Sequence, residues 1–146
     1  MKRPIRLLLI DDGDRFLAFA RRFLRGYELT HAHDLAEAQA ALAAQPDFDA
    51  ILLDLVFELP AARLSPAARK VPLDRRQRQE GLAILAALRP RFPSLPVILM
   101  TSQQGLYDEA ARALVARDES LVLLGEDAFD ARAIELLLAR TLAEAT

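Results

Sequence analysis

The sequence predicts an α/β fold in which a five-stranded parallel sheet is covered by helices on both faces. Five short apolar runs alternate with five longer segments whose apolar residues recur with the period of a helix. The apolar runs are nearly continuous, as is typical of strands that are buried on both sides of a parallel sheet. We expect one domain over residues 1–146, because a chain of this length can bury a sizeable core.

The first strand and helix are predicted within residues 5–26. The run IRLLLID (5–11) is apolar enough to be a buried strand. Residues 14–26 follow with the period of a helix. One face of this helix is apolar and comprises Phe16, Phe19, Ala20, Phe23 and Leu24. Three arginines and then Gly26 close the segment, which indicates the end of a helix.

The second strand, YELTHAH (27–33), is more polar than the first. The helix predicted after it covers residues 34–45, where Asp34 and Glu37 have the spacing of a capping box. We interpret Asp34 as a cap of this helix, and Asp14 as a cap or a solvated loop residue at the start of the preceding helix.

The third strand, DAILLDL (49–55), is separated from the third helix, GLAILAALRPRF (81–92), by an insertion over residues 56–80. A start of this helix near Asp74 is the alternative, since structureless loops of such length are uncommon unless they are functional or mobile. The insertion carries six basic and two acidic side chains after residue 60, in a chain whose net charge is −2. It is either a solvated loop or a binding surface.

The last two strand and helix pairs follow without interruption. LPVILMTS (95–102) precedes a helix over residues 105–117, and SLVLLG (120–125) precedes a helix over residues 130–145. These pairs complete the five β-α units of the predicted sheet.

Composition argues against several classes of protein. The chain has no Cys, so it forms no disulfides or thiolate metal sites, as fits a reducing compartment. Its apolar runs are far shorter than the roughly 18 residues of a membrane span. The apolar stretch near the start is also too short for a signal peptide. A net charge of −2 gives no general attraction for nucleic acid. We therefore expect a cytoplasmic domain that binds neither membranes nor nucleic acid directly.

Acidic residues stand where the predicted strands end. Asp11 and Asp12 end the first strand, and Asp54 lies near the end of the third. The fourth strand ends at Thr101. Open parallel sheets bind ligands at the carboxyl ends of their strands, and in the order 2-1-3-4-5 these three strands are neighbours. Three clustered carboxylates suit Mg2+, which takes oxygen ligands. Asp54 is also placed to act as a nucleophile toward phosphorus, with the Thr101 hydroxyl free to bond a phosphoryl oxygen.

Two histidines occupy alternate positions of the second strand. We interpret His31 and His33 as half-exposed strand residues, and a metal ion shared between them is the alternative.

Four motifs resemble the receiver domain of two-component response regulators, and the resemblance covers essentially the whole chain. They are LLLIDD and ILLDL at the ends of the first and third strands, GLAIL at the third helix and VILMTS in the fourth strand. The resemblance implies a flavodoxin-like, doubly wound sheet of order 2-1-3-4-5. It implies that Asp54 is the phosphoacceptor and that Thr101 is the switch hydroxyl. It also implies Mg2+, with Asp11, Asp12, Asp54 and the backbone carbonyl of Val56 as its ligands.

The chain departs from the receiver pattern in two regions. Receivers reach the glycine of the third helix soon after the phosphoacceptor, whereas the insertion separates Asp54 from Gly81. Receivers also end the fifth strand with an aromatic residue and a Lys-Pro pair, whereas this chain has Leu and then Gly125, Glu126 and Asp127. We expect a cation of the insertion to replace the missing Lys. The candidates are Lys70, Arg69, Arg75, Arg76 and Arg78.

Three functions are compatible with these residues. The first is a phosphorylation-dependent signalling switch, not an enzyme, whose partners are a histidine kinase or phosphotransfer protein and a downstream protein or output domain. The second is a pseudo-receiver that binds a protein partner without phosphorylation. The third, a metal-dependent phosphatase or nucleotide enzyme, ranks last because the five glycines are isolated and form no phosphate-binding loop.

Overall fold

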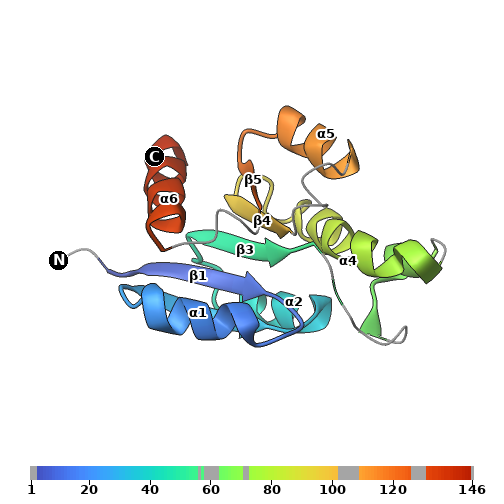
Figure 1. Ribbon diagram of the computed structural model, residues 1–146, viewed down its shortest axis with the longest axis horizontal. Coiled ribbons are helices and arrows are strands. Elements are labelled where there is room, and N and C mark those ends of the chain that lie inside the picture. The colour runs from blue at the N-terminus through green and yellow to red at the C-terminus, as the bar shows by residue number, and fades with distance from the viewer. Residues whose placement is uncertain are drawn as a thin grey trace.

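Five parallel strands form one sheet in the order β2-β1-β3-β4-β5 (Figure 1). The computed structural model describes residues 3–55, 57, 63–70, 73–101, 109–125 and 131–145. The strands are β1 (Ile5–Ile10), β2 (Tyr27–Ala32), β3 (Ala50–Asp54), β4 (Val97–Thr101) and β5 (Leu121–Gly125). The predicted fold class and the predicted strand order are therefore confirmed.

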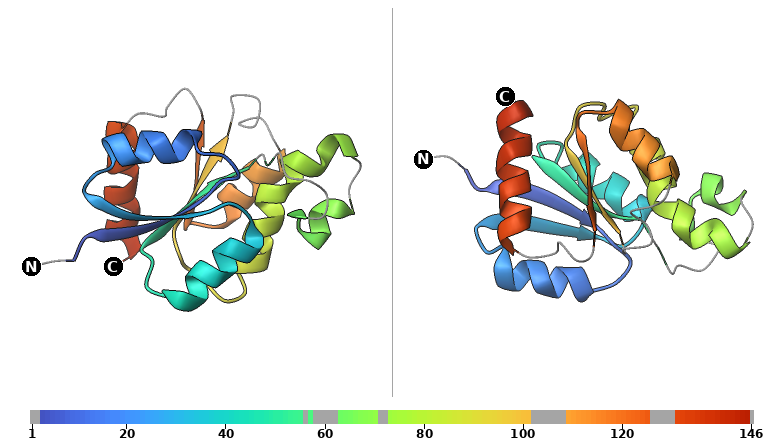
Figure 2. Two further views of the ribbon diagram at one scale, coloured as in Figure 1. Left: turned by 90° about the horizontal axis from the view of Figure 1, so that it is seen from below. Right: turned by 45° about the horizontal axis from the view of Figure 1, so that its top comes forward.

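Helices cover both faces of this sheet (Figure 2). They are α1 (Arg15–Phe23), α2 (Leu35–Ala44), α3 (Pro66–Arg69), α4 (Leu73–Leu88), α5 (Glu109–Arg117) and α6 (Ala131–Ala145). Residues of α1 and α6 share one buried apolar cluster with alternate residues of the strands. Residues of α2, α3, α4 and α5 share the other cluster with the intervening strand residues. The sheet is thus buried on both sides, as the apolar strands require.

The central strands form the core of the molecule. Strand side chains that expose at most 2% of their surface include those of Leu7, Leu9, Ile51, Leu53, Val97 and Leu99. Burial of such side chains contributes about 1.5–3 kcal/mol each to folding. None of the helices in the described ranges has the length and apolar character that crossing a membrane requires.

The first helix departs from its predicted apolar face at one position. Phe16, Ala20 and Leu24 are buried, and Phe19 packs partly against them. Phe23, the last residue of the helix, is 46% exposed. Its ring lies 5.0 Å from that of Phe19, and the Arg22 guanidinium lies 5.2 Å from its centroid.

Part of the insertion is helical. The short helix α3 precedes α4, which begins at Leu73, so the alternative of an early helix start near Asp74 is confirmed. The added residues are mostly Leu, Arg, Gln and Glu, which favour helices. The predicted end at residue 92 is four residues too late, since α4 ends at Leu88. The insertion also adds to the core, because Phe57, Leu64 and Ala68 are buried.

Candidate functional site

Three carboxylates meet at the carboxyl ends of β1 and β3. Asp11 follows β1 directly, Asp12 comes next, and Asp54 is the last residue of β3. Each contributes a carboxylate oxygen that lies within 4.8 Å of the other two. The structure thus brings together the three acidic residues that the sequence singled out. We call them the acidic triad.

The sheet fixes the backbone of the acidic triad. β1 and β3 are neighbours, with Ile10 opposite Leu53, so the two strand ends lie side by side. The Asp11 N–H donates to the Ala32 carbonyl at 3.0 Å, and the Asp11 carbonyl lies 2.8 Å from His31 Nε2. These contacts come from β2, so Asp11 is held between β2 and β3. The apolar strands therefore position carboxylates that would otherwise repel one another.

Burial makes the charge of Asp11 costly. Asp11 is 8% exposed, and this burial raises the pKa of its carboxyl group above the usual value. A hydrogen bond from the Gly13 N–H, at 3.2 Å, and the interaction with Asp54 act in the opposite direction, whereas Asp12 raises the pKa further. An all-oxygen donor set with such an excess of negative charge fits a hard divalent cation such as Mg2+.

Gly81 lets α4 lie directly against the end of β3. A Cβ at this position would lie 2.4 Å from Leu55 Cα and 2.5 Å from the Asp54 carbonyl oxygen. The Gly81 N–H donates to the Leu55 carbonyl at 3.2 Å. Glycine is therefore required here for close approach of two backbones. Because both contacts are to the strand end that carries Asp54, α4 and the acidic triad are directly connected.

The other residues predicted for the site are described in part. Thr101 ends β4 and pairs with Gly125 of β5, while its side chain lies outside the described part of the structure. Val56, Glu126 and Asp127 also lie outside the described residues. The structure therefore places Gly125 at the end of β5, opposite Thr101.

The predicted cations of the insertion are only partly described. Lys70 is exposed at the end of α3. The side chains of the other four candidates lie outside the described residues: Arg69, Arg75, Arg76 and Arg78. Arg63, which was not among the candidates, is a described cation of the insertion, and it forms ion pairs with Asp34 and Glu37.

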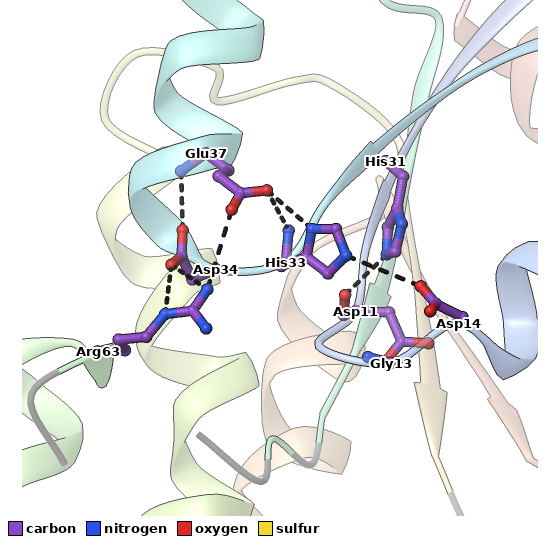
Figure 3. Close-up of polar contacts among 8 residues, drawn as sticks. All are labelled: Asp11, Gly13, Asp14, His31, His33, Asp34, Glu37 and Arg63. Atoms are coloured by element: carbon purple, nitrogen blue, oxygen red, sulfur yellow. Dashed lines mark hydrogen bonds and ion pairs between the residues drawn. The ribbon is translucent and has the colours of Figure 1, made fainter. Parts of the chain in front are cut away.

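Arg63 joins the insertion to the region beside the acidic triad (Figure 3). Its guanidinium donates to Asp34 Oδ2 from Nε at 3.1 Å and from Nη2 at 2.7 Å. These hydrogen bonds, opposed by desolvation, raise the pKa of Arg63, and the charges of Glu37 and Asp12 raise it further. The spacing of Arg63 in the sequence gives no signal for this contact, because it depends on how the insertion folds.

A second polar contact anchors the insertion to α4. Glu80 is fully buried, and its carboxylate accepts from the Ser65 N–H at 2.9 Å and from the Ser65 hydroxyl at 2.7 Å. A buried carboxylate must be hydrogen-bonded to be tolerated. Since Glu80 precedes Gly81, the insertion is attached to the part of α4 that contacts β3.

The two predicted caps differ. Asp34 caps α2, with Oδ1 accepting from the Glu37 N–H at 2.9 Å. The carboxylate of Glu37 accepts from the His33 N–H at 3.1 Å, one residue before the cap. Asp14 occupies the N-cap position of α1, but its side chain makes no capping hydrogen bond. Its backbone is in the helical region, so the carboxylate extends away from the first turn, toward His33.

Comparison with known proteins gives matches at the level of structure. No family model matches the chain, and no curated protein matches it either. The receiver domain of NtrX from Brucella abortus is 22% identical, with a TM-score of 0.71 over 94% of this chain and 98% of that one. A putative response regulator from Chloroflexus aurantiacus is 21% identical, with a TM-score of 0.69 over 97% of this chain and 99% of that one.

A longer structure of NtrX from Brucella abortus is also similar. It is 21% identical with a TM-score of 0.73, and the match covers 98% of this chain but 28% of that one. The chain described here thus has the fold of response-regulator receiver domains, and it spans about the length of one such domain.

Proposed function

We propose that this chain is a response-regulator receiver that accepts a phosphoryl group on Asp54 from a histidine kinase or a phosphotransfer protein. The observation that supports the proposal is the acidic triad at the ends of β1 and β3, in a fold shared with receiver domains. The resemblance of the motifs assigns Mg2+ to the acidic triad and the backbone carbonyl of Val56. The domain then acts as a switch for a downstream protein or output domain.

The chemistry assigns a separate role to each residue. One carboxylate oxygen of Asp54 forms the new bond to phosphorus, while the bond to the donor's leaving group breaks and the leaving group keeps the electron pair. Mg2+, when bound, neutralises negative charge on the phosphoryl group. Asp11 and Asp12 would hold the cation, and the Thr101 hydroxyl would bond a phosphoryl oxygen in the modified state.

The alternative is a pseudo-receiver that binds its partner without phosphorylation. It is supported by the sequence at the end of β5, where Gly125, Glu126 and Asp127 stand in place of the Lys of the receiver pattern. A phosphoryl group adds nearly two negative charges to a site that already holds three carboxylates. Without another cation beside Asp54, the modified state is less stable than in a receiver that carries this Lys.

A reaction with a small phosphodonor separates the two functions. We expect the wild-type protein in Mg2+ to gain the mass of one phosphoryl group, and Asp54→Asn to gain none. Asp47→Asn is the matched control, because Asp47 precedes β3 and lies at the opposite end of the sheet. Absence of any gain in the wild-type protein would favour the pseudo-receiver.

A further inference from the structure

A second group of metal-binding side chains lies beside the acidic triad. Asp14, His31 and His33 each offer one ligand atom, and these atoms all lie within 4.8 Å of one another. The two imidazole rings are 4.1 Å apart between centroids (Figure 3). We call these three residues the imidazole site.

The fold explains why the three residues converge. Tyr27 and Leu29 pack in the cluster formed with α1, so His31 continues the face of β2 that is turned toward this helix. His31 is opposite Leu9 of β1, and His33 follows the end of β2. Asp14 lies at the start of α1 on the loop that leaves β1. Two loops therefore meet at the edge strand of the sheet.

His33 is oriented by a carboxylate on one side and faces a second carboxylate on the other. Its Nδ1 lies 2.9 Å from Glu37 Oε1, which can only accept, so Nδ1 donates this hydrogen bond, and in the neutral ring Nε2 then has the lone pair for a metal. Nε2 lies 3.8 Å from Asp14 Oδ1, which is too long for a hydrogen bond. Zinc bonds to nitrogen and oxygen are about 2.0–2.2 Å long, so one ion can bridge these two atoms.

His31 is oriented in the same manner. Its Nε2 lies 2.8 Å from the Asp11 carbonyl oxygen, which can only accept a hydrogen bond. Histidines that bind metals usually donate their other ring N–H to a carboxylate or a backbone carbonyl, and this contact fixes the ring. Both arrangements are present here, with Glu37 beside His33 and the Asp11 carbonyl beside His31.

The ligand types select a different ion from that of the acidic triad. Imidazole nitrogens suit Zn2+, Co2+ and Ni2+, whereas Mg2+ requires oxygen ligands. The whole chain contains two His and no Cys. A metal site with two imidazole ligands can therefore form only where His31 and His33 meet.

We propose that Asp14, His31 and His33 bind a transition-metal ion of the Zn2+ class and join the loop after β1 to the end of β2. The side chain of Asp14 is 83% exposed and that of His33 is 40% exposed, so the ion enters directly from solvent and water completes its coordination. The same loop carries Asp11 and Asp12. The bound ion thus restrains the loop that carries Asp11 and Asp12. Its binding does not depend on phosphorylation of Asp54.

Calorimetric titration with Zn2+ tests this site when Mg2+ is present in excess. We expect one Zn2+ to bind per wild-type chain. We expect at least about tenfold weaker binding in each of Asp14→Asn, His31→Gln and His33→Gln, since loss of a residue that only hydrogen-bonds to a metal ligand already lowers metal affinity by about this factor. Asp14→Asn is the most informative variant, because so exposed a side chain contributes little to folding. Equal affinity in this variant and the wild-type protein would overturn the assignment of Asp14.

A second variant separates the imidazole site from the acidic triad. Asp12→Asn with Asp54→Asn should lose Mg2+ and retain Zn2+, whereas His33→Gln should lose Zn2+ and retain Mg2+. Zn2+ binding that is lost in the former and kept in the latter would assign the ion to the acidic triad and overturn the proposal. Nitrogen NMR gives an independent readout: Zn2+ should shift Nε2 of His33 while Nδ1 keeps its proton, and a metal-bound Nδ1 would contradict the geometry.

Discussion

Arg63 of the insertion donates two hydrogen bonds to one carboxylate oxygen of Asp34, the residue that caps α2. This pair connects residues on opposite sides of β3 in the sequence. Among the contributions that raise the pKa of Arg63, the charge of Asp12 is the smallest, so this guanidinium interacts weakly with the acidic triad. We therefore expect Arg63 to compensate in part for the Lys that the receiver pattern has at the end of β5.

We predict that Arg63→Ala lowers the yield or the lifetime of the phosphorylated protein. The Arg63 side chain is 46% exposed, so solvent screens its charge and the expected effect is small. The measurement is the time course of phosphorylation and of phosphoryl loss. Arg21→Ala in α1 is the matched control, and identical time courses in both variants would exclude Arg63 as a contributor.

We predict that Asp34→Asn lowers stability at neutral pH and has a smaller effect in acid. Burial opposes ionisation of Asp34, but the hydrogen bonds from the Glu37 N–H and from Arg63 outweigh it and lower its pKa. Because the pKa is lowered, the ionised carboxylate stabilises the folded state at pH values above 3.8, the pKa in the unfolded chain. This stabilisation is lost as the pH falls through the pKa of the folded state. Urea unfolding between neutral and acidic pH measures the difference. A difference that does not change with pH would contradict this interpretation.

We predict that Asp11→Asn leaves the metal-free protein as stable as the wild type, or more stable, at neutral pH. Burial raises the pKa of Asp11, so the folded state holds this proton more tightly than the unfolded chain does. The stability of the wild type therefore falls as the pH rises through the folded pKa. Mg2+ should stabilise the wild type and not the variant. Thermal unfolding with and without Mg2+ measures both effects, and a destabilised variant in the absence of metal would show that Asp11 has a structural role.

We predict that Gly81→Ala destabilises the protein by about 1–3 kcal/mol, because the new Cβ overlaps backbone atoms that cannot move aside easily. The same change should also weaken Mg2+ binding, since the overlap displaces the Asp54 carbonyl. Gly26→Ala is the matched control, as a Cβ there meets nothing within 4 Å. Chemical denaturation of the two variants is the measurement. Equal stability would mean that α4 does not press against β3 as described.

The sequence predicted best those elements whose own composition decides their structure. The central residues of β1, β3 and β4 are apolar because both faces of these strands are buried, so each strand could be recognised from a short run of residues. The acidic triad followed from this, since Asp11 and Asp54 stand at the ends of two such strands. For His31 and His33 the sequence favoured half-exposed strand residues over a shared metal ion, and it gave no sign that Asp14 lies beside them.

Contacts made by the insertion could not be predicted in the same way. Arg63 and Asp34 are 29 positions apart, and Ser65 and Glu80 are 15 apart, so each pair depends on the folded path of the chain between its members. The exposure of Phe23 likewise depends on where α1 ends relative to the sheet. These features are set by tertiary packing, which overrides the local pattern.

The dependence of Asp54 phosphorylation on Mg2+ tests the central claim most directly, because it joins the acidic triad to the proposed function. The initial rate with a small phosphodonor is measured by mass spectrometry of the peptide that contains Asp54, over a range of Mg2+ concentrations. We predict a rate that rises and saturates with Mg2+ in the wild-type protein and that is largely lost in Asp12→Asn or when the metal is chelated. A phosphoryl group on another residue, or a rate that is independent of Mg2+ and of Asp12, would contradict the account.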